Sequence, residues 1–161
     1  MIDISELSGA STSIEVAASD NIFEELGNNT YDFKDILSEL IDNSIAARRA
    51  DTRLNVEIKL YFNKDNIPQY FVITDNASGI PEESLGKAIS PAGIQSHNSL
   101  NEHGLGMKQA VAALGKLDYL ATKTLHEETA RLVTKFKFGN LDVYRTSDFP
   151  NNVGTEIKVS N

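Results

Sequence analysis

The longest regular pattern of apolar residues in the chain lies between residues 33 and 50. Its apolar side chains recur at intervals of three and four residues: Phe33, Ile36, Leu37, Leu40, Ile41 and Ile45. This spacing places them on one side of a helix. Glu39 and Asn43 lie four residues apart on a different side, which continues into small alanine residues. The pattern therefore predicts a helix over residues 33–50 with one face for a core and another on which a ligand docks.

Other stretches alternate apolar and polar residues, or are apolar on both faces, as strands of a covered sheet do. The predicted strands span residues 54–62, 70–74, 117–124, 130–138 and 156–160. In the strand at 130–138, Leu132 is expected to face one way and Arg131 the other. The alternation implies a sheet covered by helices on one face and wetter on the other.

The remaining segments are less regular. Residues 1–18 fit either an edge strand or a loose arm, and residues 19–161 are expected to form one domain. Short helices are predicted at 20–26, after Pro81, and at 107–115. Residues 86–103 contain glycine, proline, serine and histidine with little periodicity, which is typical of a mobile functional loop.

Composition narrows the class of protein. The chain has 161 residues and a net charge of −8, which argues against a nucleic-acid surface because phosphate binding needs clustered Lys and Arg. It has no cysteine, so disulfides and thiolate metal sites are excluded. The N-terminus lacks the pattern of a signal peptide, and no apolar stretch is long enough to span a bilayer. These features predict a soluble, cytoplasmic protein without a membrane partner.

Two glycines precede the predicted helix at 107–115 and suggest an anion site. A helix N-terminus presents N–H groups without helical partners, and Gly104 and Gly106 would let phosphate oxygens approach the backbone. The chain has no GxxxxGK[ST] motif, and this stretch lacks the last glycine of a dinucleotide-binding fingerprint. Neither of these two common phosphate-binding folds is therefore indicated.

The polar residues on the central helix and after the strand at 70–74 fit a metal–nucleotide site. Mg²⁺ takes oxygen ligands and keeps several waters, so one amide oxygen from Asn43 would suffice beside substrate phosphates. Glu39, one turn away, could orient a water for attack on a terminal phosphate. Asp75 offers a carboxylate acceptor for an exocyclic amine such as that of adenine, with Gly79 leaving room for the ring.

Four motifs in this order resemble a known family. Glu39-Leu40-Ile41-Asp42-Asn43-Ser44 resembles the N-box of the GHKL ATPases, which include gyrase, the ninety-kilodalton heat-shock chaperones, histidine kinases and MutL. Asp75-Asn76-Ala77-Ser78-Gly79-Ile80 resembles their adenine-binding box, and Gly104-Leu105-Gly106-Met107-Lys108 their lid-hinge box. Gly154-Thr155-Glu156-Ile157 is similar to the Gly-Thr pair of their last strand. Together the motifs cover residues 20–160.

The resemblance implies the Bergerat fold, an α/β (α+β) two-layer sandwich with helices on one face of a mixed sheet, and it implies MgATP as ligand. By position, Glu39 would be the catalytic base and Asn43 the Mg²⁺ ligand. Asp75 would bind the adenine amine directly and through a water shared with Thr155. The other positions that the resemblance places at ATP are Ala46, Gly79, Ile80, Gly104, Leu105, Gly106, Met107 and Lys108.

The implied activity is Mg²⁺-dependent ATP binding with slow hydrolysis under a lid at residues 86–103. Hydrolytic members of the family take a phosphate-sensing lysine from a second domain, so a further domain or a partner would supply it, with ATP-dependent self-association. Two alternatives stay open: a nucleotide-binding switch without useful hydrolysis, and a protein kinase of the histidine-kinase type. Within the family, the stretch around His103 looks most similar to MORC-type ATPases.

One position departs from the family pattern. The adenine-binding box usually reads Asp-x-Gly-x-Gly, and this chain has Ala77 at the first glycine. Alanine disfavours a positive φ, so the turn is expected to differ slightly while binding survives.

Overall fold

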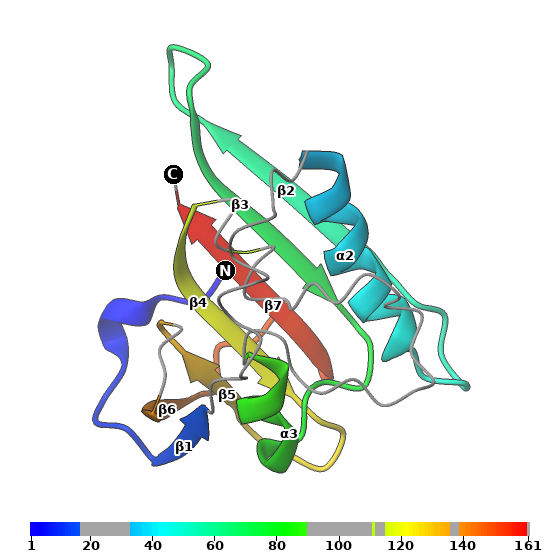
Figure 1. Ribbon diagram of the computed structural model, residues 1–161, viewed down its shortest axis with the longest axis vertical. Coiled ribbons are helices and arrows are strands. Elements are labelled where there is room, and N and C mark those ends of the chain that lie inside the picture. Colours follow the sequence, from blue (N-terminus) through cyan, green and yellow to red (C-terminus); the bar gives the residue numbers. More distant parts are fainter. Residues whose placement is uncertain (17–32, 90–110, 112–114, 136–138, 161) are drawn as a thin grey trace, which may run out of the picture.

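The computed structural model describes residues 1–16, 33–89, 111, 115–135 and 139–160. These ranges contain one seven-stranded sheet with helices beside it (Figure 1). The helical elements are η1 (Ile4–Glu6), α2 (Phe33–Ala46) and α3 (Glu82–Ala88). The strands are β1 (Thr12–Val16), β2 (Val56–Phe62), β3 (Pro68–Asp75), β4 (Lys116–Lys123), β5 (Ala130–Val133), β6 (Gly139–Thr146) and β7 (Gly154–Ser160).

The strand order is β1-β6-β5-β4-β7-β3-β2, and each of the six pairings is antiparallel. The two-layer α/β arrangement expected for the chain is confirmed, but the described sheet is antiparallel and not mixed. The reason lies in β7, which is inserted between β3 and β4. Because β7 runs antiparallel to both neighbours, β3 and β4 are parallel to each other without being paired.

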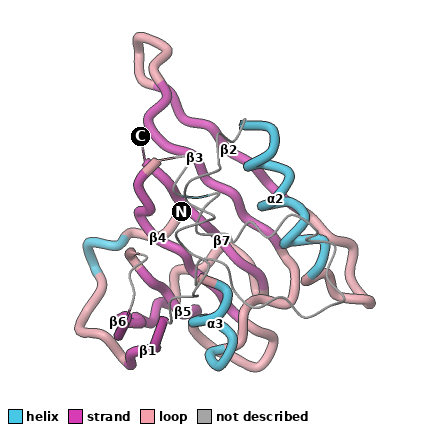
Figure 2. Tube along the Cα trace, viewed as in Figure 1, coloured by secondary structure: helices cyan, strands magenta, loops and turns pink. Residues whose placement is uncertain are grey.

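The helical layer and the main core lie on one face of this sheet. Ile36 and Leu40 of α2 and Leu85 of α3 belong to the same buried cluster as Ile73 and Ile157 of the central strands. In Figure 2 the strands form a continuous layer, and the β2–β3 hairpin projects beyond the helices. Spanning a bilayer would take a longer and more apolar helix than any the structure describes.

The opposite face of the sheet is covered in part by the N-terminal residues. Ile2 is 4% exposed and packs with Tyr119 of β4 and Leu132 of β5 in a second apolar cluster. The Ile2 N–H donates to the Tyr119 hydroxyl at 3.0 Å. Residues 12–16 then form the edge strand β1, paired with β6, which is one of the two alternatives predicted for this segment. The second face is therefore less wet than the strand alternation suggested.

The central helix and most of the predicted strands are present. α2 ends at Ala46, four residues before the predicted end, because the chain turns there to meet the segment after β3. The Arg48 N–H bonds the Ile45 carbonyl, three residues back, and the Ala47 carbonyl accepts from the Ser78 N–H at 2.9 Å. The short helix after Pro81 is confirmed as α3, so residues 86–88 belong to it and not to an irregular loop.

The structure differs from the predicted strands at two places. No strand was expected at residues 139–146, where β6 lies. The strand predicted at 130–138 ends at Val133 as β5. Arg131 and Leu132 lie on opposite faces, as the alternation predicts, and all four residues of β5 are buried because both faces of the sheet are covered there. Leu132 packs in the cluster with Ile2, whereas Val133, like the helices, belongs to the main core. The predicted helix at 20–26, the rest of the loop to 103 and all but two residues of the helix at 107–115 lie outside the described residues.

Candidate functional site

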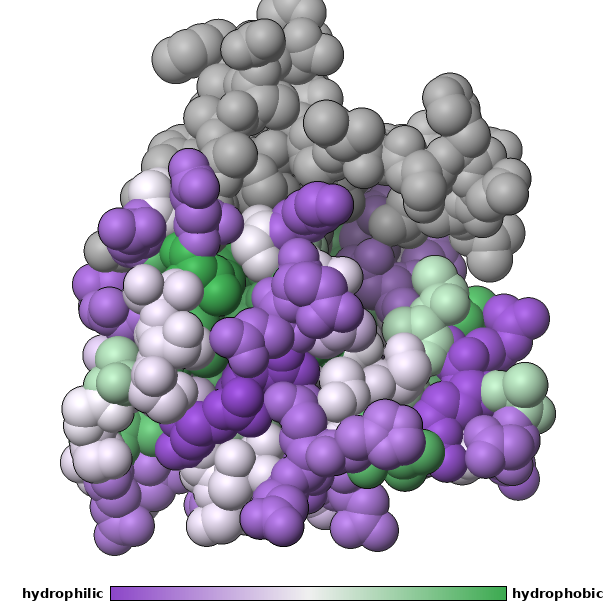
Figure 3. Space-filling view, turned by 90° about the horizontal axis from the view of Figure 1, so that it is seen from below, coloured by the Kyte–Doolittle hydropathy of each residue, from purple (hydrophilic) through white to green (hydrophobic). Residues whose placement is uncertain are grey.

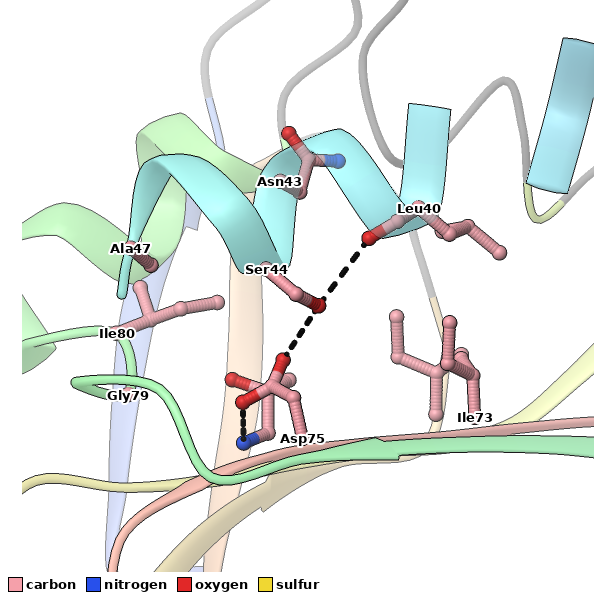
Figure 4. Close-up of a pocket in the computed structure, with 10 residues that line it drawn as sticks. Leu40, Asn43, Ser44, Ala47, Ile73, Asp75, Gly79 and Ile80 are labelled. Atoms are coloured by element: carbon pink, nitrogen blue, oxygen red, sulfur yellow. Dashed lines mark hydrogen bonds between the residues drawn. The ribbon is translucent and has the colours of Figure 1, made fainter. Parts of the chain in front are cut away.

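A pocket opens between α2, the end of β3 and the start of β7. Its volume is about 460 Å³, which includes the space at its mouth. The lining residues are Leu40, Asn43, Ser44, Ala47, Ile73, Asp75, Gly79, Ile80, Thr155 and Ile157 (Figure 4). Most of this lining is apolar, with a few polar groups between, which is typical of small-molecule sites. Five of the residues singled out from sequence, Asn43, Asp75, Gly79, Ile80 and Thr155, come together here from three distant segments.

The Asp75 carboxylate lies deep in this pocket, 8% exposed. Its Oδ1 accepts the backbone N–H groups of Ala77 and Thr155, each at 3.0 Å. Its Oδ2 accepts the Ser44 hydroxyl at 2.8 Å. Burial raises the pKa of Asp75 above its usual value, although the hydrogen bonds from Ala77, Ser44 and Thr155 oppose that rise. The three donors hold the carboxylate in one orientation.

These hydrogen bonds leave a defined acceptor position. A carboxylate has about four lone-pair sites, two on each oxygen. Among the described residues, two donors occupy Oδ1 and one occupies Oδ2. The remaining site on Oδ2 suits one further donor, such as an amino group of a ligand in the pocket.

Ser44 owes its position to the buried stripe of α2. Ile36, Leu40 and Ser44 are spaced four residues apart and are 4%, 3% and 4% exposed. Ile36 and Leu40 pack in the core, and Ser44 then places a hydroxyl at the pocket. Sequence reasoning did not select Ser44 as a site residue. A polar residue continuing an apolar stripe was the available signal, because a buried hydroxyl needs a partner.

Two glycines allow the segments around Asp75 to approach closely. Gly79 has a φ of +72°, and a Cβ there would collide with the Lys123 carbonyl at the end of β4. Gly154, with a φ of +137°, begins β7 where a Cβ would collide with the Asp75 carbonyl. Both conformations favour glycine. The close approach at Gly154 is what brings the Thr155 N–H onto the Asp75 carboxylate.

The alanine that replaces a family glycine is accommodated without strain. Among the described residues, Asn66 is the non-glycine residue with a positive φ, so Ala77 has an ordinary backbone conformation. Its side chain is 1% exposed, and its N–H donates to Asp75. The turn therefore keeps its role as a donor to the carboxylate.

Asn43 lines the pocket, half-buried, one helical turn beyond Glu39. Glu39 is 9% exposed and is not among the lining residues. Within the described ranges no three His, Asp or Glu side chains gather into a metal site. An amide oxygen from Asn43 would fit a Mg²⁺ ion that keeps several waters and is held mainly by substrate phosphates.

The other predicted positions divide into two groups. Ala46 is exposed and does not line the pocket, whereas Ala47 does, because helical periodicity places residue 47 above residues 43 and 44. The positions of the glycine-rich stretch, Gly104, Leu105, Gly106, Met107 and Lys108, lie outside the described residues. Leu40, Ile73, Ala47 and Ile157 also line the pocket, and sequence reasoning did not name them as site residues.

Comparison with solved structures found MutL proteins. The chain has 19% identity with the Aquifex aeolicus MutL ATPase domain complexed with ADP, with a TM-score of 0.49 and coverage of 83% of this chain and 43% of that one. A second structure, the ATPase domain of the Aquifex aeolicus mismatch repair endonuclease MutL, has 18% identity, a TM-score of 0.45 and coverage of 79% and 38%. The chain thus spans less than half the length of either. No curated protein matches it.

Comparison with protein families gave a match over most of the chain. The model described as histidine kinase-, DNA gyrase B-, and HSP90-like ATPase matches residues 31–150. This range contains α2 with Asn43 and the turn after β3 with Asp75. No finding singles out the MORC branch. The chain belongs to the family of histidine kinase-, DNA gyrase B- and HSP90-like ATPases.

Proposed function

We propose that this chain binds ATP with Mg²⁺ and hydrolyses it, with the adenine in the pocket between α2, β3 and β7. The observation that carries the proposal is the Asp75 carboxylate, which is buried, held by three donors and left with one acceptor position in the pocket. Family membership supports ATP as the ligand.

The acceptor on Asp75 predicts a preference for adenine. The 6-amino group of adenine is a donor and matches the remaining lone pair on Oδ2. Guanine has a carbonyl oxygen at the same ring position, which a carboxylate repels. Ile73, Ile80 and Ile157 provide apolar contacts for the flat faces and edges of the ring. ATP should therefore bind more tightly than GTP.

The phosphates would extend from the base toward the first half of α2. Asn43 is the pocket residue with an amide oxygen for Mg²⁺, which when bound would neutralise phosphate charge. Glu39 lies one helical turn before Asn43 and carries the carboxylate that we assign to orienting and deprotonating the attacking water. A lysine from another domain or from a partner would complete the phosphate contacts.

The test measures binding and turnover separately. Titration calorimetry with ATP and MgCl₂ should show binding, and GTP should bind more weakly. Glu39→Gln should keep ATP affinity within about twofold and lower phosphate release by about 100-fold or more, the contribution of a general base. Asp35→Asn is the matched control, since Asp35 is an exposed carboxylate one turn earlier on α2 and should leave both measurements unchanged.

Asn43→Ala separates the contribution of the metal to ATP binding from that of the adenine base. It should weaken ATP binding in MgCl₂ while leaving adenosine affinity unchanged, because adenosine has no phosphates. Absence of ATP binding to the native protein would contradict the whole proposal. Binding without turnover in the native protein would contradict hydrolysis and favour a nucleotide-binding switch.

A further inference from the structure

We propose that Arg131 of β5 is a positioning residue for the base of the nucleotide, because it fixes Ile80 in the wall of the pocket. The inference rests on the proposed function and extends it to a side chain outside the pocket lining. It starts from the Ile80 backbone, both of whose polar groups are held by buried side chains from the neighbouring strands.

The Ile80 N–H donates to Thr122 Oγ1 at 2.8 Å, and the Ile80 carbonyl accepts from Arg131 Nη2 at 2.8 Å. Thr122 of β4 is fully buried, and Arg131 is 1% exposed. Thr122 Oγ1 also lies 3.2 Å from the Oγ1 of Thr155, another residue of the pocket lining. Two strands therefore fix the backbone on both sides of the Ile80 side chain.

The guanidinium itself is held in place by Glu127, at the turn between β4 and β5. Arg131 Nη2 donates to Glu127 Oε2 at 2.6 Å, so one nitrogen serves both the carboxylate and the Ile80 carbonyl. Glu127 Oε2 also accepts from the Thr124 N–H at 3.0 Å and from the Thr124 hydroxyl at 2.8 Å. Burial of a guanidinium is costly without such a partner. The charge pair thus stabilises Arg131 in the position that reaches Ile80.

A second arginine occupies the outer side of the same carboxylate. Arg145 of β6 donates to Glu127 Oε1 at 2.9 Å and lies 3.5 Å from Glu82 of α3. The end of the molecule that carries α3 and β1 is seen in Figure 3, where the coloured surface is largely hydrophilic. Arg145 shares the charge network, but within the described part of the chain its hydrogen bonds go to Glu127, Thr129 and Glu82 and not to Ile80, so it provides a matched control.

The consequence for the ligand concerns the base alone. Ile80 would contact the purine ring, whereas the phosphates extend toward Asn43. Its carbonyl accepts from Arg131, and the proposed acceptor for the amino group is Asp75. Loss of the hydrogen bond from Arg131 to the Ile80 carbonyl should make the pocket wall beside the base less rigid. Adenosine and ATP should then lose affinity by the same factor.

The experiment compares adenosine and ATP affinities, by calorimetry well below the melting temperature, in four proteins: native, Arg131→Met, Arg131→Lys and Arg145→Gln. Arg131→Met should weaken both ligands about tenfold and equally. Arg131→Lys keeps the charge beside Glu127 but loses the planar fork, so it should fold and weaken both ligands by about threefold. Arg145→Gln should bind both within about twofold of the native protein.

The outcomes separate this inference from the proposed function. If the native protein binds neither adenosine nor ATP, the proposed function itself is wrong. If the native protein binds both and folded Arg131→Lys binds adenosine as tightly, Arg131 is not a positioning residue, and the proposed function stands. Equal losses in Arg145→Gln and the Arg131 variants would also overturn the inference, because they would show a general loss of stability. Should Arg131→Met not fold, Arg131→Lys decides the question.

Discussion

Two buried carboxylates lie side by side in the central strands, on opposite faces of the sheet. Asp75 ends β3 and faces the pocket beside Thr155. Glu156 is the next residue of β7, pairs with Thr74 of β3 and is 3% exposed. Successive residues of a strand point to opposite faces. Thr155 lies beside Asp75 on the face with the helical layer, so Glu156, the next residue, faces away from that layer.

The two carboxylates differ in what satisfies them. Glu156 accepts the Tyr119 hydroxyl at 2.6 Å and the Thr74 hydroxyl at 2.9 Å, both from the sheet itself. Ile2 packs against Tyr119 and donates to its hydroxyl, so the N-terminal residues cover this group. Burial, followed by the hydrogen bond to Glu156, raises the pKa of Tyr119, which therefore stays a donor. Burial alone thus does not mark a ligand-binding carboxylate, and the role proposed for Asp75 rests on its position in the pocket.

The largest effect is expected from Asp75→Asn. The amide keeps the size of the side chain and can still accept from Ala77 and Thr155. It places an NH₂ group where Oδ2 accepts from Ser44 and where we propose that the adenine amine binds. ATP affinity should fall about 100-fold, as for a lost hydrogen bond to a charged group. Calorimetry measures it.

The control for Asp75→Asn is Asn151→Ala. Asn151 donates to the Asp75 backbone carbonyl and not to the carboxylate, so its loss should change affinity by less than about threefold. Asp75→Asn with native ATP affinity would remove Asp75 from the base site.

Glu156→Gln should have the reverse profile. The free energy of unfolding should fall by about 1–2 kcal/mol, because one of two hydroxyl donors would meet an amide donor. ATP affinity should change by less than about twofold, since the side chain faces away from the pocket. Urea unfolding and calorimetry on the same sample give both values. A loss of affinity comparable with that of Asp75→Asn would end the distinction between the two carboxylates.

The sequence was sufficient for the parts of the fold that rest on local periodicity. The spacing of apolar residues located α2, and alternation located β2, β4 and β7 to within a few residues. Asn43, Asp75 and Thr155 were identified by family motifs and lie in one pocket, while their roles stay predictions. The end of α2 was harder to predict from local periodicity, because the helix ends where a distant segment binds the Ala47 carbonyl.

The parts that escaped sequence reasoning depend on contacts between distant residues. Alternation predicts only that Arg131 and Leu132 face opposite ways, and nothing local shows that Arg131 binds the Ile80 carbonyl and Glu127. Ile2 was likewise assigned to a strand or loose arm, yet its burial depends on Tyr119, which is 117 residues away. Such positions require the packed structure.

The smallest expected effect is the pH dependence of adenosine binding, which tests the role of the Asp75 carboxylate in the comparison with Glu156. Burial raises the pKa of Asp75 in the folded protein, against hydrogen bonds from Ala77, Ser44 and Thr155. The folded state therefore holds the proton more tightly than the unfolded state, so this group's contribution to stability decreases as the pH rises from its usual pKa through the raised value. Binding of the amine requires the ionised carboxylate. Adenosine affinity should accordingly fall as the pH is lowered toward the raised pKa.

The measurement is an adenosine titration from neutral pH to about pH 5, where an exposed aspartate would still be ionised. We expect affinity to decrease by up to about threefold at the acidic end. Asp75→Asn provides the baseline, because any slope that it retains belongs to adenosine or to other groups. Glu127 should act in the opposite sense on stability: burial would raise its pKa, but hydrogen bonds from Thr124 and Arg145 and the charge of Arg131 lower it overall. Its contribution is therefore present above its usual pKa and is lost as the pH falls through the lowered value. An affinity that is independent of pH, or equally dependent in Asp75→Asn, would show that the Asp75 carboxylate does not receive the ligand.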